Sequence, residues 1–216
     1  MGRLQAVIFD MDGVLADSEP LYLAGINQVL EAYGVELTPA ENEETIGTTV
    51  EVTWGKVIER FSLPPEAYEE CVRRYDRAME TLLREPQEPL PGVRPLLAEL
   101  RRRGTPYALA SSAWPNWIAS LLEATSLEGS FDVIVSRTMV EHGKPAPDIF
   151  LYAAERLGVA PERCIVLEDT PTGIAAAKAA GMYAVQMRAA STAFPPLPEA
   201  DLVLESLEDF PFSLLE

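Results

Sequence analysis

Short apolar runs alternate with amphipathic segments along most of this chain. The first run spans residues 4–9, and the later ones span 107–110, 132–135, 164–167, 183–186 and 201–204. Between the later runs, apolar residues recur at helical spacing over residues 93–102, 117–124, 148–157 and 173–180. Repeated strand–helix units predict an α/β fold, a Rossmann-like parallel sheet with helices on both faces.

One long stretch interrupts this alternation. Between Leu15 and a proline-rich joint at residues 85–92, apolar residues follow only helical spacing, which predicts helices over 18–33, 39–45, 50–61 and 65–83. We expect residues 1–15 and 86–216 to form the α/β core. Residues 16–85 are expected to form an inserted all-helical cap over the carboxyl ends of the strands, where open α/β sheets bind ligands.

Composition and charge narrow the range of partners. The chain has 216 residues, of which 48% are hydrophobic, and 17 basic against 34 acidic residues give a net charge of −17. Such a charge repels nucleic acids and anionic membrane surfaces, so neither is expected as a partner. The pattern leaves open whether the protein is a monomer or a small homo-oligomer.

The cysteines and the hydropathy indicate a cytoplasmic location. Cys71 and Cys164 lie far apart and fall in apolar patterns, so we expect two buried, reduced thiols. No apolar segment reaches transmembrane length, and the first residues lack the pattern of a signal peptide.

Polar side chains follow four of the predicted strands. Because the carboxyl ends of parallel strands share one edge of a sheet, these side chains are expected to meet in one crevice. In chain order they are Asp10 and Asp12, Ser111 and Ser112, Lys144, and Glu168 and Asp169. Each group alone also fits a helix cap, a turn or a solvated surface residue, but the four groups together favour a functional site.

The chemistry of these side chains favours phosphoryl transfer. Four converging carboxylates repel one another, and an oxygen-only ligand set suits a hard cation such as Mg²⁺. Lys144 and Ser111 add a positive charge and a donor for a phosphoryl group. One carboxylate can serve as nucleophile and one two residues on as general acid and base. His142, the only histidine, lies in a predicted turn, so histidine-based triads are excluded.

With these segments, the chain resembles the haloacid dehalogenase superfamily, in particular its β-phosphoglucomutase and phosphoglycolate phosphatase-like members with a helical cap. The segments that carry the resemblance are 9–15, 17–19, 110–112, 143–148 and 167–174. The resemblance implies that Asp10 is the nucleophile and a Mg²⁺ ligand. It also implies that Asp12 is the acid and base, with its backbone carbonyl on the metal. Further implied roles are phosphoryl binding by the serines of segment 110–112 and by Lys144, and metal binding by Glu168 and Asp169.

Three departures from that pattern concern the substrate. Tyr22 stands where the sugar mutases carry a histidine, and Gly47 is followed by Thr48, Thr49 and Val50 without the arginine of the mutases. The loop at residues 113–115, Ala-Trp-Pro, is unusually apolar where close relatives often carry a polar run, so fewer phosphate contacts are expected from it. The acid at position 12 argues against dehalogenation.

The sequence therefore predicts a Mg²⁺-dependent phosphatase that hydrolyses a phosphomonoester of a small metabolite through an aspartyl-phosphate on Asp10. A phosphosugar mutase is the main alternative, and a non-catalytic regulatory module that binds phosphate is the less favoured one. The cap residues expected near the substrate are Tyr22, Thr48, Thr49 and Trp54.

Overall fold

Six strands form one sheet in which every neighbouring pair runs parallel. The computed structural model describes residues 4–190 and 194–215. The strands are β1 (Ala6–Phe9), β2 (Tyr107–Ser111), β3 (Ile134–Ser136), β4 (Cys164–Glu168), β5 (Tyr183–Met187) and β6 (Leu202–Leu204). Their order is β3-β2-β1-β4-β5-β6, which puts the first strand of the chain at the centre. Phe9 at the end of β1 is in register with Leu109 and Leu167, so the ends of β1, β2 and β4 meet at one edge.

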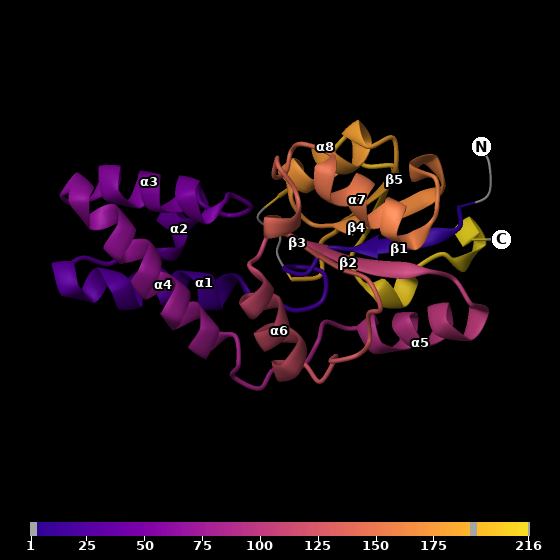
Figure 1. Ribbon diagram of the computed structural model, residues 1–216, viewed down its shortest axis with the longest axis horizontal. Coiled ribbons are helices and arrows are strands. Elements are labelled where there is room, and N and C mark those ends of the chain that lie inside the picture. Colours follow the sequence, from indigo (N-terminus) through magenta and orange to yellow (C-terminus); the bar gives the residue numbers. More distant parts are fainter. Residues whose placement is uncertain (1–3, 191–193, 216) are drawn as a thin grey trace.

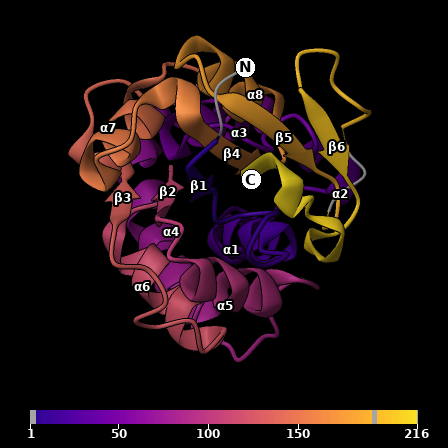
Figure 2. The same cartoon turned by 90° about the vertical axis from the view of Figure 1, so that its right-hand side faces the viewer.

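Helices cover both faces of the sheet, as predicted (Figure 2). They are α5 (Val93–Arg103), α6 (Pro115–Ala124), α7 (Asp148–Leu157) and α8 (Pro171–Ala179). Side chains alternate along β1, because Val7 and Phe9 join one buried cluster with α5 and α6, whereas Ala6 and Ile8 join another with α7 and α8. This division explains why the central strand is apolar throughout.

A second group of helices lies at one end of the sheet (Figure 1, left). It comprises α1 (Glu19–Leu30), α2 (Pro39–Asn42), α3 (Val50–Arg60) and α4 (Tyr68–Leu82), with 3-10 turns at Glu31–Tyr33 and Pro65–Ala67. α4 packs along α1 and α3, and no strand occurs in the described chain between β1 and β2. The exact division into domains stays a prediction, and residues 1–3, 191–193 and 216 of the predicted core lie outside the described residues.

Predicted and observed elements differ mainly at their ends. α8 begins at Pro171, two residues before the predicted start, because the Thr170 hydroxyl accepts the N–H of Gly173 at 3.1 Å and caps the helix. β2 extends one residue further than predicted and includes Ser111. This shift changes the surroundings of the Ser111 side chain.

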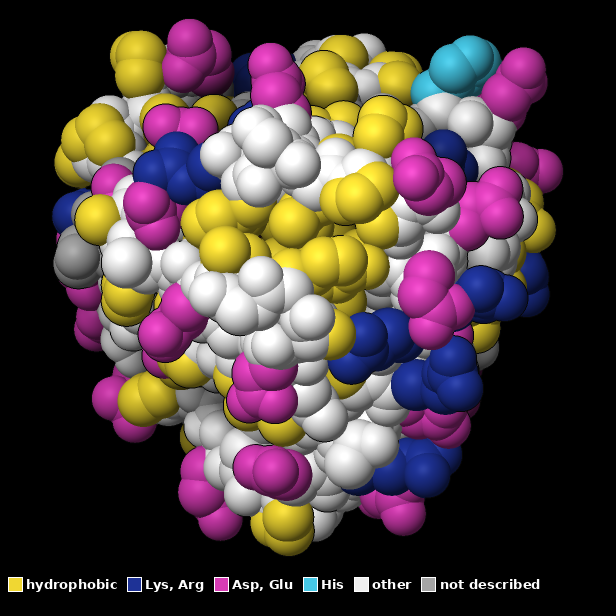
Figure 3. Space-filling view, turned by 90° about the vertical axis from the view of Figure 1, so that its left-hand side faces the viewer, with side chains coloured by type: hydrophobic (Ala, Val, Ile, Leu, Met, Phe, Trp, Pro, Cys, Tyr) yellow, Lys and Arg dark blue, Asp and Glu magenta, His cyan; other side chains and the backbone are white. Residues whose placement is uncertain are grey.

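The surface matches the acidic composition. On the face that the cap presents, acidic side chains are spread among fewer Lys and Arg, with hydrophobic side chains gathered near the centre (Figure 3). Cys71 and Cys164 are both free and buried, which confirms the expectation for the thiols. Among the residues that the structure describes, no helix combines the length and apolarity needed to cross a bilayer.

Candidate active site

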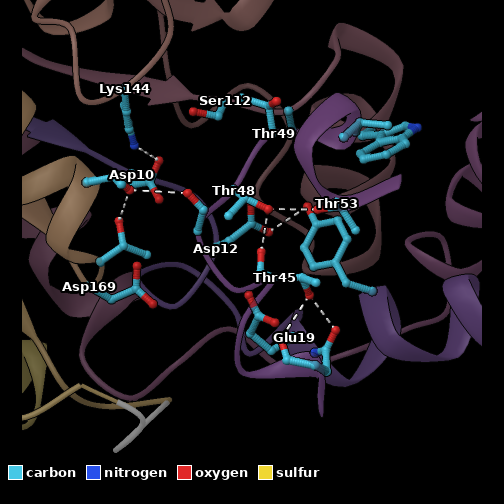
Figure 4. Close-up of a pocket in the computed structure, with 18 of the residues that line it drawn as sticks. Asp10, Asp12, Glu19, Thr45, Thr48, Thr49, Thr53, Ser112, Lys144 and Asp169 are labelled. Atoms are coloured by element: carbon cyan, nitrogen blue, oxygen red, sulfur yellow. Dashed lines mark hydrogen bonds and ion pairs between the residues drawn. The ribbon is translucent and has the colours of Figure 1, made fainter. Parts of the chain in front are cut away.

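The ends of β1 and β4 hold two carboxylates against one lysine (Figure 4). Lys144, from the loop before α7, donates from Nζ to Asp10 Oδ1 at 2.7 Å and to Glu168 Oε1 at 2.8 Å. All three side chains are less than a tenth exposed. Backbone pairing fixes the arrangement, since the N–H of Asp10 donates to the carbonyl of Leu167 at 2.9 Å.

Burial and charge act against each other in this cluster. Burial raises the pKa of the Asp10 carboxyl to about 7, although Lys144 opposes the shift. Burial alone would lower the pKa of Lys144, but the attraction of Asp10 and Glu168 outweighs it and raises that pKa above the ordinary lysine value. Lys144 therefore remains charged at neutral pH and favours the ionised form of Asp10.

Three carboxylates can together hold a metal ion. Asp10, Glu168 and Asp169 each offer an oxygen, and these oxygens lie within 4.8 Å of one another. Asp169 Oδ1 is buried and has no hydrogen-bond partner among the described residues. Gly13, at φ +71°, leaves room for the Asp169 carboxylate, which a Cβ at position 13 would overlap. Oxygen donors alone, with one unpaired and buried, fit a hard divalent cation.

Asp12 does not belong to this group of three carboxylates, and its side chain faces neutral partners. Its Oδ1 accepts hydrogen bonds from the hydroxyl of Ser18 and from the hydroxyl of Tyr22, the latter at 3.0 Å. Burial raises the pKa of Asp12, which these two hydrogen bonds oppose. A carboxyl group with a raised pKa and no cation in direct contact is suited to give and take a proton.

A cavity between the cap and the core contains most of the predicted site residues. Nine of them line it: Asp10, Asp12, Tyr22, Thr48, Thr49, Ser112, Lys144, Glu168 and Asp169. The cap contacts the core beside this cavity, where the hydroxyl of Thr172, at the start of α8, donates to the carbonyl of Gly47 at 3.2 Å.

Two of the predicted site residues lie elsewhere. Ser111 is fully buried as the last residue of β2, and its Oγ accepts the N–H of Ala113 at 3.0 Å, so the exposed Ser112 lines the cavity in its place. Trp54 was expected near the substrate but is fully buried in the cap, where its ring packs on Tyr75 at 5.6 Å. Large apolar rings favour such a core position over a wet cavity.

The apolar loop at residues 113–115 packs against an aromatic side chain. Ala113 lines the cavity, and the ring of Trp114 lies 5.1 Å from the ring of Trp117. Trp117 also lines the cavity and contacts Tyr22, with ring centroids 6.0 Å apart. The loop therefore supports one wall of the cavity through packing.

Several cap residues that line the cavity were not predicted from the sequence. They include Glu19, Ile26, Asn42, Thr45, Gly47, Val50, Thr53 and Tyr75. A helical signal could have found the first of them, because Glu19, Tyr22 and Ile26 are spaced along one face of α1 and all line the cavity.

Comparison with known proteins agrees with this geometry. Residues 7–187 match the family described as haloacid dehalogenase-like hydrolases. The chain belongs to this family. This result confirms the resemblance seen in the sequence, and the matched range contains both the helical cap and every carboxylate of the site.

Individual relatives cover nearly the whole chain of this hydrolase. A probable pseudouridine-5'-phosphatase of Drosophila melanogaster is 36% identical over 209 residues, which is 94% of this chain and 90% of that protein. The β-phosphoglucomutase of Bacillus subtilis is 32% identical and covers 98% of this chain and 94% of its own length. The crystal structure of CbbY from Rhodobacter sphaeroides with xylulose-1,5-bisphosphate is 27% identical, has a TM-score of 0.86 and covers 99% of each chain. These relatives make the chain a phosphatase by class, within a family that also contains mutases.

Proposed function

We propose that this chain is a Mg²⁺-dependent phosphatase that hydrolyses a small metabolite's phosphomonoester through a phosphoryl group carried on Asp10. The observation that carries the proposal is the contrast between the two carboxylates of the first motif. Asp10 contacts a charged lysine at 2.7 Å, whereas the side chain of Asp12, two residues on, accepts hydrogen bonds from the hydroxyls of Ser18 and Tyr22 and pairs with no cation among the described residues. An ionised nucleophile and a protonatable partner need these different surroundings.

In the first step, an Asp10 carboxylate oxygen attacks phosphorus, and the bond between phosphorus and the leaving oxygen breaks. Asp12 gives its proton to that oxygen, so the alcohol leaves neutral. Lys144 neutralises charge near the attacking carboxylate, and Ser112 offers a hydroxyl on the same wall. The closed cap excludes bulk water during this step.

In the second step, water attacks the phosphorus of the aspartyl-phosphate. Asp12, now ionised, takes a proton from that water, and the phosphorus–oxygen bond to Asp10 breaks. Inorganic phosphate and the free Asp10 carboxylate result, and Asp12 is again protonated. The same residue thus acts as acid and then as base.

The metal would be held by Asp10, Glu168 and Asp169, whose oxygens lie within 4.8 Å of one another. When bound, Mg²⁺ would supply positive charge for the phosphoryl oxygens and favour the ionised forms of these buried carboxylates. Lys144 and the ion would then stand on the same side of the cavity as Asp10.

The substrate class rests on the relatives and on the cavity. Relatives named for a nucleotide phosphatase and a sugar-phosphate mutase act on small phosphorylated metabolites, and the cavity is lined by residues of both the cap and the core. A mutase is less well supported, because Lys144 is the only Lys or Arg among the described residues that line the cavity. A bisphosphate intermediate would lack a cationic contact for its second phosphate.

The test is phosphate release from a panel of phosphomonoesters, with Mg²⁺ and with chelator. We expect release that depends on Mg²⁺ and is lost in Asp10→Asn, which keeps the shape of the side chain but removes the nucleophile. Asp132→Asn, at an exposed aspartate outside the cavity, is the matched control and should retain activity. Isomerisation without release would favour the mutase, and no turnover of any substrate would favour the regulatory module.

A further inference from the structure

The cavity has two chemically different halves (Figure 4). Lys144, Asp10 and Asp169 lie together on the core side, where the phosphoryl chemistry is proposed. Glu19, Thr45 and Thr53 lie on the other side, and each comes from the cap. The alcohol half of a phosphate ester would occupy this cap side, because its phosphoryl group must reach Asp10.

The hydroxyl groups of three threonines on the cap side already donate hydrogen bonds to other groups of the protein. Thr45 donates to the carbonyl of Asn42 at 2.9 Å and lies 2.7 Å from the Asn42 side-chain oxygen, and Thr48 donates to the carbonyl of Thr45 at 2.7 Å. Thr48 and Thr53 are joined by a hydrogen bond of 2.8 Å. Because the Thr48 hydroxyl already donates its hydrogen to the carbonyl of Thr45, Thr53 is the donor in this bond. All three hydroxyls therefore present only lone pairs to a ligand.

Glu19 adds a carboxylate to this wall. It is half-buried at the start of α1, lines the cavity, and has no hydrogen bond or ion pair with any residue that the structure describes. Burial, followed by the charges of Asp12 and Asp17, raises its pKa to about 7. A half-buried carboxylate without donors is costly, and hydroxyl groups of a ligand would satisfy it.

The donors that remain on the cap side are neutral. The hydroxyl of Tyr75 and the side-chain amide of Asn42 line the cavity, and neither donates to another described residue. They can bind the oxygen of an alcohol but do not neutralise an anion. Together with the acceptors, they form a wall suited to hydroxyl groups, which both donate and accept.

We propose that Glu19 is a specificity-determining residue that selects phosphate esters with a neutral, polyhydroxylated alcohol half and rejects esters whose alcohol half carries a second anion. This inference rests on the proposed phosphatase function and narrows its substrates. Glu19 acts by accepting hydrogen bonds from the hydroxyls of the alcohol and by repelling a carboxylate or phosphate placed beside it.

The test compares glucitol 6-phosphate with 6-phosphogluconate, which differ in that a terminal CH₂OH is replaced by a carboxylate. We expect the wild type, assayed at about pH 8.5 so that Glu19 is ionised, to prefer glucitol 6-phosphate by about tenfold or more in kcat/KM, since like charges brought together disfavour the second ester. Glu19→Gln should bring the ratio of the two kcat/KM values close to one, mainly through KM. Glu31→Gln, at an exposed residue just after the same helix, is the control and should keep the wild-type ratio.

The outcomes separate this inference from the proposed function. An unchanged ratio in Glu19→Gln, or a wild-type preference for 6-phosphogluconate, overturns the role of Glu19 while the phosphatase activity stands. Absence of turnover of both esters and of p-nitrophenyl phosphate by the wild type overturns both. If Glu19→Gln does not fold, Glu19→Ala, which removes the charge and leaves more room, replaces it, and circular dichroism confirms its fold.

Discussion

Gly173→Ala tests whether the buried Glu168 carboxylate keeps Lys144 in place. Gly173 lies in the first turn of α8, and a Cβ there would overlap the carboxylate of Glu168. That carboxylate is fully buried, accepts from Lys144 Nζ at 2.8 Å, and also accepts the N–H of Thr170. An alanine at position 173 forces the Glu168 carboxylate to move, because the new Cβ would overlap its Cδ and both of its oxygens.

The expected loss of stability in Gly173→Ala follows from the interactions that this substitution breaks. Breaking a buried ion pair costs about 3–5 kcal/mol, since one charge stays buried without its partner. Replacing glycine by alanine in a helix gains at most about 1 kcal/mol, and less in the first turn. We therefore expect Gly173→Ala to lower the free energy of unfolding by about 2–4 kcal/mol. The phosphatase kcat should fall by about tenfold or more, because Lys144 loses one of its two carboxylate contacts.

Gly55→Ala is the matched control. Gly55 also lies in a helix, α3, but a Cβ there would meet no atom within 4 Å. Urea unfolding should show a gain of about 0.5–1 kcal/mol for this variant, and activity should be unchanged. The reasoning is refuted if Gly173→Ala is as stable and as active as Gly55→Ala.

Three further predictions concern other parts of the chain. Asp76→Ala should cost about 1–3 kcal/mol in urea unfolding, because Trp117 Nε1 loses its acceptor at 2.8 Å, whereas Asp76→Asn should cost less than half as much. Folding lowers the pKa of the half-buried Glu41 from 4.5 to about 2, chiefly through the Thr38 N–H, so its stabilisation is complete above pH 4.5 and lost toward pH 2. Thermal melts of Glu41→Gln should therefore converge with those of the wild type as the pH falls, and a constant difference would contradict this linkage. Asp12→Asn should lower kcat for an alkyl phosphate by about 100-fold or more. The rate of phosphoryl transfer from p-nitrophenyl phosphate should fall much less, because a good leaving group needs no acid. Equal losses for the two substrates would count against Asp12 as the acid.

The core side of the site could be predicted from the sequence because the topology of a parallel sheet fixes where the residues that follow each strand lie. Parallel strands end at one edge, and the register of Phe9 with Leu109 and Leu167 places the residues after them side by side. Asp10 and Asp169 thus come together whatever the packing of the surrounding helices. Lys144 belongs to a longer loop, so strand register does not fix its position. It could be assigned to the site only because the clustered carboxylates need a positive charge, and it does contact Asp10.

Two predicted residues, Ser111 and Trp54, lie outside the cavity lining, and at each of them a single residue of register decides the direction of the side chain. Ser111 and Ser112 are adjacent, and the extra residue of β2 keeps the first in the strand and leaves the second at the cavity. In α3, Thr53 and Trp54 point differently, the hydroxyl to the cavity and the ring to the cap core. Spacing alone does not say which face of a cap helix meets the core, because that depends on how the cap closes.

The cap side bears on the choice between hydrolysis and isomerisation. A mutase must keep a doubly phosphorylated intermediate bound while its second phosphate approaches the nucleophile, which needs a cation far from Asp10. Among the described residues that line this cavity, the sole cation, Lys144, already contacts two carboxylates, and Glu19 adds a further carboxylate on the side away from Asp10. A neutral alcohol would form only hydrogen bonds with this wall and no ion pair, so we expect it to depart before water attacks the phosphoryl group. With the proposed role of Glu19, hydrolysis is therefore expected, and isomerisation would require a cation in the cap.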